Sequence, residues 1–182
     1  HMNTLPEFTQ AGLAGESVHT MVRTVADLEG VFQDDDAFGN CDPDTVVYRV
    51  ESYTPVEAGT PGGLFFGVTH LMPGRVGGEY FMTKGHFHEK RDRAEFYWGI
   101  AGQGLLVLMD ESGESWTEEV RPGSLHYVPA HTAHRLVNTG NEVLDTGACW
   151  PSDAGHDYGS ITESGFSSRV MAGESGPEIV RQ

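Results

Sequence analysis

Two histidines and a glutamate that lie close together in the chain are the residues best suited to chemistry. His86 and His88 are two apart, so on a β-strand both side chains point to the same face. Glu95 begins the next expected strand, and His134 supplies a fourth side chain of a metal-binding type. Three imidazoles and one carboxylate suit Fe(II), Mn(II), Ni(II) or Zn(II). Because a closed structural zinc site would prefer thiolates, the set predicts an open metal site.

The motifs around these residues resemble the two signatures of the cupin superfamily. The segment from Gly123 to Asn138 fits the pattern G-x5-P-x-G-x2-H-x3-N, except that His131 replaces the second glycine. In the other motif, six residues separate His88 from Glu95, where the common pattern has three or four. The runs TKGHFH, DRAE-x-Y, AHR-x-VN and P-x-DAGHDYG are similar to archaeal-type phosphoglucose isomerase, the cupin form of glucose-6-phosphate isomerase.

This resemblance covers about residues 22 to 170 and implies a reaction and a cofactor. The reaction is the metal-dependent interconversion of glucose 6-phosphate and fructose 6-phosphate through an enediol-type intermediate. One divalent ion per chain, Fe(II) before Mn(II), Ni(II) or Zn(II), would be held by His86, His88, Glu95 and His134. The implied catalytic residues are Glu95, Tyr97 and His156, and the implied substrate-binding residues are Tyr48, Thr69, Thr83 and Gly85. A homodimer is also implied.

The phosphate of such a substrate would need a local group of donors, because the chain carries a net charge of −16. The same charge argues against nucleic acid as a partner. Thr83 and Gly85 would offer a hydroxyl and a backbone N–H to phosphate oxygens. Lys84 and Arg135 could add positive charge or could equally be solvated surface residues. Trp150 stands where the resemblance leads us to expect a tyrosine.

Two other functional classes stay open. An Fe(II) cupin dioxygenase uses a similar ligand set, but its substrates need no phosphate donors, so the TKG run before His86 would be unexplained. A sugar-binding or sensor cupin without catalytic activity would keep the pocket and need no metal. Fold alone does not choose among these classes.

The remaining histidines and the cysteines are interpreted as structural. His70 lies outside the two motifs, His126 flanks a predicted strand within the second motif, and His131 lies at the turn position of the second motif. Cys41 and Cys149 are far apart in the sequence and form no C-x-x-C pair, which indicates reduced thiols.

The strand pattern predicts an all-β fold, and the resemblance specifies the cupin double-stranded β-helix, or jelly roll. Short alternating segments recur about every ten residues between Gly or Pro turns, and no long helical period appears. We expect one cupin domain over residues 1–182 with its core at about 45–150. One predicted strand runs from Gly78 through Met82 into the two histidines.

Outside this core the sequence predicts little regular structure. Residues 3–21 are expected to form an extended arm or edge strand, followed by a short helix capped by Thr24 and ended by Gly30. Residues 34–40 are expected to form a loop, and residues 171–182 a frayed tail. His1-Met2 is interpreted as a tag remnant. No apolar run approaches the ~20 residues that span a bilayer, which predicts a cytoplasmic protein without membrane contact.

Overall fold

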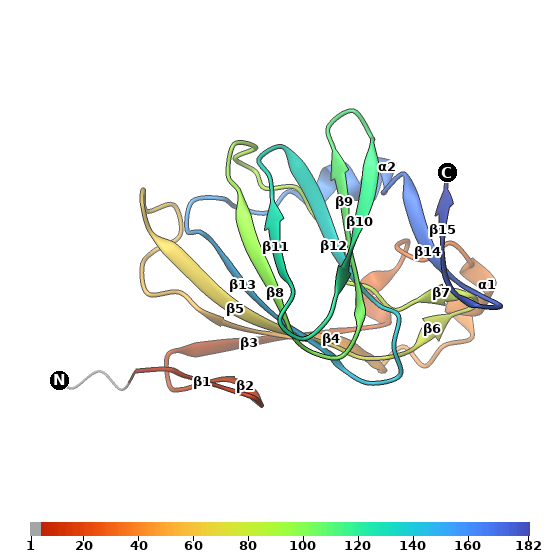
Figure 1. The fold of residues 1–182 in the computed structure, drawn as a ribbon, viewed down its shortest axis with the longest axis horizontal. Helices are drawn as coiled ribbons and strands as arrows, with labels where there is room; N and C mark the ends of the chain where they lie inside the picture. Colours follow the sequence, from red (N-terminus) through yellow and green to blue (C-terminus); the bar gives the residue numbers. More distant parts are fainter. Residues whose placement is uncertain (1–4) are drawn as a thin grey trace.

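The computed structural model describes residues 5–182, and antiparallel β-strands dominate it (Figure 1). A six-stranded sheet has the order β11-β8-β13-β5-β4-β3, and a three-stranded sheet has the order β10-β9-β12. Their strands are β3 (Val18–Thr24), β4 (Val46–Tyr53), β5 (Leu64–Leu71), β8 (Glu95–Ala101), β9 (Gly104–Asp110), β10 (Ser115–Val120), β11 (Leu125–Val128), β12 (Thr132–Asn138) and β13 (Leu144–Pro151). This two-sheet arrangement confirms the predicted all-β jelly roll.

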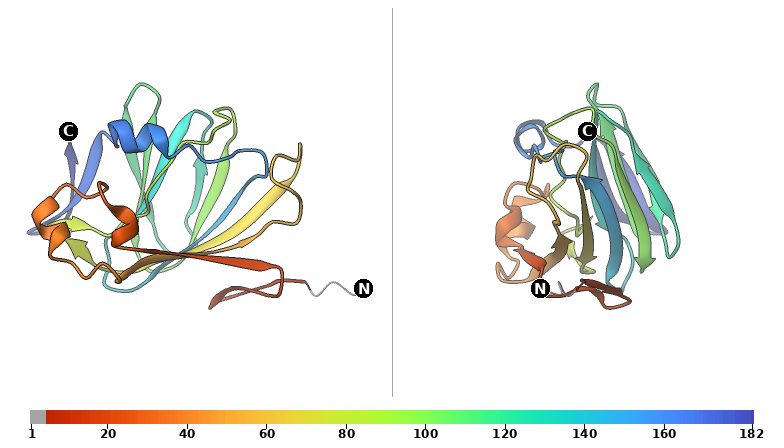
Figure 2. Two further views of the ribbon diagram at one scale, coloured as in Figure 1. Left: turned by 180° about the vertical axis from the view of Figure 1, so that it is seen from behind. Right: turned by 90° about the vertical axis from the view of Figure 1, so that its left-hand side faces the viewer.

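Smaller elements surround these two sheets (Figure 2). They are β1 (Glu7–Thr9), β2 (Gly12–Ala14), a 3₁₀ turn (Ala26–Leu28), α1 (Asp35–Gly39), β6 (Arg75–Val76), β7 (Glu79–Tyr80), α2 (Gly159–Ser164), β14 (Ser168–Gly173) and β15 (Gly176–Arg181). Within residues 5–182, no helix is long and apolar enough to cross a membrane.

The hydrophobic core lies between the two main sheets. Leu71 of β5, Leu106 and Leu108 of β9 and Leu144 at the start of β13 are fully buried in one cluster. Strand β12 is buried along its whole length instead of alternating between core and solvent. Side chains on both of its faces are therefore shielded from water, and this includes the predicted ligand His134.

The prediction of a frayed tail at residues 171–182 is wrong. Strands β14 and β15 form an antiparallel hairpin, and β14 also pairs with β7 in a four-stranded sheet. Most side chains of β15 are exposed, because it is an edge strand. A polar composition is therefore compatible with regular pairing here, and composition alone could not reveal the hairpin.

The prediction of a loop at residues 34–40 is also wrong, because α1 forms there. The side chain of Asp34 accepts a hydrogen bond from the Ala37 N–H at 2.8 Å and caps the helix. Asp35 and Asp36 follow in the first turn, where the helix dipole favours negative charge. The acidic run that resembled a loop is thus a helix start. Similarly, α2 forms at residues for which no helix is predicted.

The segment that carries the first two histidines is not a continuous strand as predicted. Strand β7 ends at Tyr80, and beyond it only isolated bridges form, including one between His86 and His134. Gly85 has a φ of +76°, which interrupts the strand before the histidines. The segment is held by β12 through these bridges, so its irregular backbone still has a fixed position.

The N-terminal part of the chain agrees in outline with the prediction of an arm and an edge strand. Strands β1 and β2 form a hairpin, and β3 is the edge strand of the six-stranded sheet. The expected short helix is a single 3₁₀ turn, which Thr24 does not cap; instead Thr24 donates two hydrogen bonds to the Asp27 carboxylate. The predicted tag remnant at His1-Met2 lies outside the described residues, as do residues 3 and 4 of the arm.

Candidate metal centre and its pocket

A cavity of about 330 Å³ lies between the two main sheets. Its walls come from strands β3, β4, β5, β8, β12 and β13 and from the irregular segment 83–86. Small-molecule sites in proteins have volumes of roughly 300–1,000 Å³, so the cavity suits a ligand of modest size.

The four predicted ligands, His86, His88, Glu95 and His134, lie together beside this cavity. One possible ligand atom from each residue lies within 4.8 Å of the other three. The backbone of His86 pairs with that of His134 through N–H to O distances of 3.3 Å and 3.1 Å. Glu95 enters from the first position of β8, as the spacing predicted.

The nitrogens of this cluster are not all satisfied by protein partners. His88 Nε2 lies 2.9 Å from Glu95 Oε2 in hydrogen-bonding geometry. His134 Nε2 lies 2.9 Å from the same oxygen but is not aligned for a hydrogen bond, and His86 Nε2 is buried without a partner among the described residues. Buried side-chain nitrogens rarely lack a partner. The cluster therefore fits a divalent cation that accepts these lone pairs.

Burial and neighbouring charge set the protonation states of the cluster. Burial alone would raise the pKa of Glu95, but the adjacent His134 and His88 outweigh burial and hold the pKa at about 2. Burial, reinforced by the neighbouring histidines, lowers the pKa of His86 well below its ordinary value. At neutral pH the carboxylate is ionised and His86 is neutral, and metal binding requires both states.

A backbone contact also sets the orientation of His88. Its Nδ1 donates to the carbonyl oxygen of Arg93 at 2.7 Å, which directs Nε2 toward the cluster. Histidines that bind metals usually make such a contact through the other ring nitrogen, because it fixes both tautomer and ring angle. The arrangement is the one expected for a histidine prepared to bind an ion.

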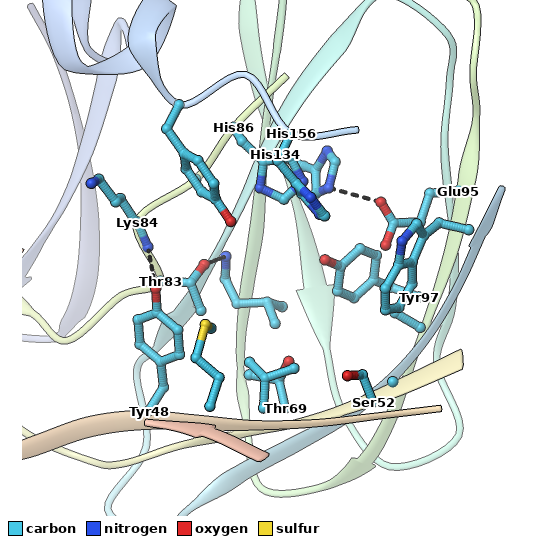
Figure 3. A pocket seen from close by; sticks show the side chains of 18 of the residues that line it. Tyr48, Ser52, Thr69, Thr83, Lys84, His86, Glu95, Tyr97, His134 and His156 are labelled. Atoms are coloured by element: carbon cyan, nitrogen blue, oxygen red, sulfur yellow. Dashed lines mark hydrogen bonds and ion pairs between the residues drawn. The ribbon is translucent and has the colours of Figure 1, made fainter. Parts of the chain in front are cut away.

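The side chains and backbone that the resemblance assigned to the substrate all line the cavity: Tyr48, Thr69, Thr83, Gly85, Tyr97 and His156. In Figure 3, Thr83 and Lys84 lie on one side of the histidines, and Glu95 and Tyr97 lie on the other. A ligand that fills the cavity can therefore touch both groups.

The turn formed by Thr83, Lys84 and Gly85 presents donors to the cavity. Thr83 Oγ1 accepts a hydrogen bond from the Leu136 N–H at 3.0 Å, so its own hydroxyl proton is free to donate. A Cβ on Gly85 would lie 2.7 Å from the Phe166 ring, and φ is positive there, so glycine is required.

His156 and Tyr97 contact the histidines of the cluster from two directions. The His156 ring centroid lies 4.4 Å from that of His86, and the Tyr97 ring centroid lies 5.5 Å from that of His134. Burial lowers the pKa of His156, while burial and the nearby Glu95 carboxylate raise the pKa of Tyr97 well above its ordinary value. Both side chains are therefore neutral at physiological pH and available as hydrogen-bonding groups.

Lys84 and Arg135 have different environments. Lys84 lines the cavity, and its Nζ lies 5.5 Å from the centre of the Tyr158 ring. Arg135 is buried and does not line the cavity; it donates to the backbone oxygens of Thr83 and Lys84 at 3.1 Å and 2.7 Å. Arg135 is therefore not a solvated surface residue. Its two hydrogen bonds to the backbone fix the position of the Thr83–Gly85 turn.

Several cavity residues were not predicted as site residues. Tyr158 stacks on His156 with ring centroids 5.8 Å apart, and its place in DAGHDYG could have indicated it. His19 and Ser52 also line the cavity, from β3 and β4. Nothing in their sequence context distinguishes them, because they reach the cavity only through strand pairing. Trp150, at the expected tyrosine position, lines the cavity as well.

The other histidines and the two cysteines have structural environments, as interpreted from the sequence. Cys41 and Cys149 are both free thiols. The three histidines lie outside the cavity, each beside a carboxylate: His70 with Glu51 and Asp145, His126 with Glu118, and His131 with Glu111. His131 has a φ of +62°, which explains why the cupin pattern has glycine at this position.

Comparison with known proteins identifies the family. The model of the family "Glucose-6-phosphate isomerase (GPI)" matches residues 22–181. The chain belongs to the glucose-6-phosphate isomerase family. The glucose-6-phosphate isomerase of Thermococcus kodakarensis is 47% identical over 88% of this chain and 84% of its own length. That of Thermococcus litoralis is 42% identical over 91% of this chain and 87% of its own.

These relatives also confirm the resemblance to the archaeal-type isomerases. The glucose-6-phosphate isomerase of Pyrococcus horikoshii is 44% identical over 86% of this chain and 82% of its own length. Among solved structures, oxalate decarboxylase from Bacillus subtilis overlaps more weakly, with a TM-score of 0.44 and 22% identity over 59% of this chain and 25% of that chain. The chain is therefore placed in the glucose-6-phosphate isomerase family by its sequence relatives.

Proposed function

We propose that this chain is a metal-dependent glucose-6-phosphate isomerase that holds one divalent ion, Fe(II) or alternatively Mn(II), Ni(II) or Zn(II), through His86, His88, Glu95 and His134. The observation that carries the proposal is the cluster of four ligand atoms within 4.8 Å, which includes two buried imidazole nitrogens without hydrogen bonds among the described residues. Membership of the isomerase family supplies the substrate pair. The cytoplasmic location and the homodimer stay predictions.

A bound ion in this cluster would act as a Lewis acid toward the sugar oxygens. Glu95 takes the proton from C2 of the open-chain aldose and returns it to C1, while the proton of the C2 hydroxyl passes to the C1 oxygen; the reverse reaction moves both protons back. Since Oε2 faces His88 and His134, the other oxygen of the carboxylate is available for this proton. A carboxylate with a pKa of about 2 is ionised but weakly basic, so the reaction depends on stabilising the developing oxyanion.

The other cavity residues hold the substrate in this mechanism. Neutral Tyr97 and His156 hydrogen-bond the sugar hydroxyls beside the reacting carbons. Thr83, with the backbone of Gly85, binds the phosphate, and Lys84 adds a positive charge on the same side of the cavity. Tyr48 and Thr69 contact the sugar from β4 and β5.

One assay separates this function from the alternatives. Fructose 6-phosphate is supplied to the metal-loaded protein, and glucose 6-phosphate formation and oxygen uptake are followed in parallel. We expect isomerisation without oxygen uptake. Oxygen consumption with a phosphosugar or another substrate would indicate a dioxygenase, and binding without turnover would indicate a sugar-binding protein.

Replacing Thr83 with alanine should raise KM for fructose 6-phosphate more than it lowers kcat. The phosphate does not react, so losing its hydrogen bond weakens ground state and transition state alike. A hydrogen bond to a charged group contributes about 1.5–3 kcal/mol, which corresponds to a KM increase of about 10- to 150-fold. Thr83→Ser keeps the hydroxyl and serves as the matched control. A collapsed kcat with unchanged KM would place Thr83 at the reacting end of the sugar instead.

A further inference from the structure

The segment between His88 and Glu95 is longer than the common cupin spacing, and each of its basic side chains binds the loop at residues 153–157; Arg91 Nε also lies 3.2 Å from Glu111 Oε1, in the turn after β9. Lys90 Nζ donates to Asp153 Oδ2 at 3.0 Å. Arg93 forms a two-pronged contact with the same carboxylate, through Nε to Oδ1 at 2.9 Å and Nη2 to Oδ2 at 2.8 Å. The Asp153 side chain is only 5% exposed, so these pairs are shielded from solvent on one side.

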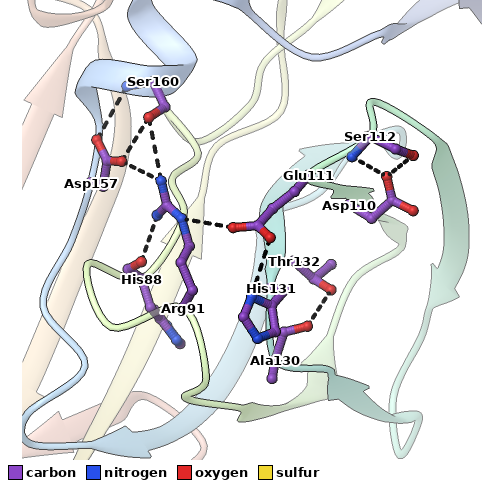
Figure 4. A network of polar contacts seen from close by, with 10 residues as sticks. All are labelled: His88, Arg91, Asp110, Glu111, Ser112, Ala130, His131, Thr132, Asp157 and Ser160. Atoms are coloured by element: carbon purple, nitrogen blue, oxygen red, sulfur yellow. Dashed lines mark hydrogen bonds and ion pairs between the residues drawn. The ribbon is translucent and has the colours of Figure 1, made fainter.

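Arg91 binds the other end of the same loop, as Figure 4 shows. Its Nη2 donates to Asp157 Oδ2 at 2.6 Å, and its Nη1 donates to the backbone oxygen of His88 at 2.6 Å. Asp157 also accepts hydrogen bonds from the N–H and the hydroxyl of Ser160, at the first turn of α2. Arg91 therefore joins the backbone of a predicted ligand to the loop and to the helix that follows it.

Backbone hydrogen bonds run alongside these ion pairs. Lys90 N–H donates to Ala154 O at 3.0 Å, and Phe87 and Asp157 exchange N–H to O bonds of 3.2 Å and 2.8 Å. His156 lies between the two bound aspartates, so fixing residues 153 and 157 fixes its backbone from both sides. Its ring centroid then lies 4.4 Å from that of His86, and the Tyr158 ring stacks on it while also lying 5.3 Å from His86.

We propose that Arg91 and Arg93 are positioning residues that clamp residues 153–157 against the ligand-bearing segment, so that His156 and Tyr158 close over the metal cluster. The extra length between His88 and Glu95 supplies the clamp. Its effect on catalysis rests on the proposed isomerase function, whereas its effect on the loop does not.

The structural part of the clamp is tested by hydrogen exchange on the metal-free protein. Arg91→Met and Arg93→Met should each make the amides of residues 153–157 exchange at least ~10-fold faster, because the loop opens more often. Exchange of residues 46–53 of β4, which neither arginine contacts, should be unchanged. Arg75→Met, at an exposed arginine of β6, is the matched control. Should Arg91→Met not fold, Asp157→Asn breaks the same pair from the other side. If the amides of residues 153–157 exchange at the wild-type rate in both Arg91→Met and Arg93→Met, the proposal is overturned.

The catalytic part is tested by a double-mutant cycle with kcat/KM as the readout and metal content measured for each variant. Arg91→Met alone should lower kcat/KM by about 10- to 100-fold, as expected for misplaced catalytic groups. In a His156→Ala background, Arg91→Met should lower kcat/KM much less, because Arg91 acts through the loop that carries His156. Equal losses in both backgrounds would overturn the positioning role. Faster loop exchange in a chain without isomerase activity would instead refute only the proposed function.

Discussion

The Glu95→Gln variant is expected to bind metal and to lose at least ~10²-fold in kcat, the lower end of a general base's usual contribution. Glutamine keeps the shape of the side chain and one oxygen that can still coordinate weakly, but it cannot accept the proton. The ion would remain on His86, His88 and His134. The measurement is metal content per chain beside kcat at saturating metal.

The outcome also distinguishes a base from a ligand. If Glu95 only binds metal, occupancy should fall in the variant and activity should recover with excess metal. Glu118→Gln is a suitable control, because Glu118 contacts His126 outside the cavity. A Glu95→Gln protein with full metal and near-normal kcat would refute the base assignment.

The second large effect is expected from His86→Ala. Mutating a residue that hydrogen-bonds a metal ligand typically lowers metal affinity about 10- to 100-fold. Losing the ligand itself should therefore weaken metal binding by at least ~10²-fold. The His86 side chain is only partly buried and its Nε2 has no hydrogen-bond partner among residues 5–182, so its removal should cost little folding stability. Equilibrium titration with Mn(II) and a thermal melt of the metal-free protein measure the two quantities.

His126→Gln is the matched control for this change, because His126 is a buried histidine that contacts Glu118 and Ser124 outside the cavity. It should leave the Mn(II) dissociation constant unchanged. Wild-type metal affinity in His86→Ala would remove His86 from the predicted ligand set.

Sequence spacing brings together the cluster of His86, His88, Glu95 and His134 because part of it depends on simple strand geometry. Glu95 begins a predicted strand, and His134 lies on the observed strand β12. The buried Asn138 at the end of the second motif fixes a turn by donating to Leu71 O and Glu142 O. The two histidines of the first motif reached the same place for a different reason. Gly85 breaks their strand, and a backbone bridge to His134 replaces the expected pairing.

The parts that sequence reasoning missed depend on contacts between distant segments. The hairpin β14–β15 has a polar edge strand, and α1 begins at an acidic run, so both resembled irregular segments. In the sequence Arg135 is indistinguishable from a surface arginine, although it is buried and donates to the backbone oxygens of Thr83 and Lys84. Such burial is a property of the assembled sheets and leaves no local signal.

We propose that isomerisation requires an ion held by His86, His88, Glu95 and His134. The most direct test is to strip the protein of metal with a chelator, then add Fe(II) anaerobically in steps and measure fructose 6-phosphate isomerisation against metal bound per chain. We predict no activity without metal and a linear rise that stops at one ion per chain, with Mn(II) or Ni(II) also restoring activity. Full activity in a sample shown to contain no metal would contradict the account.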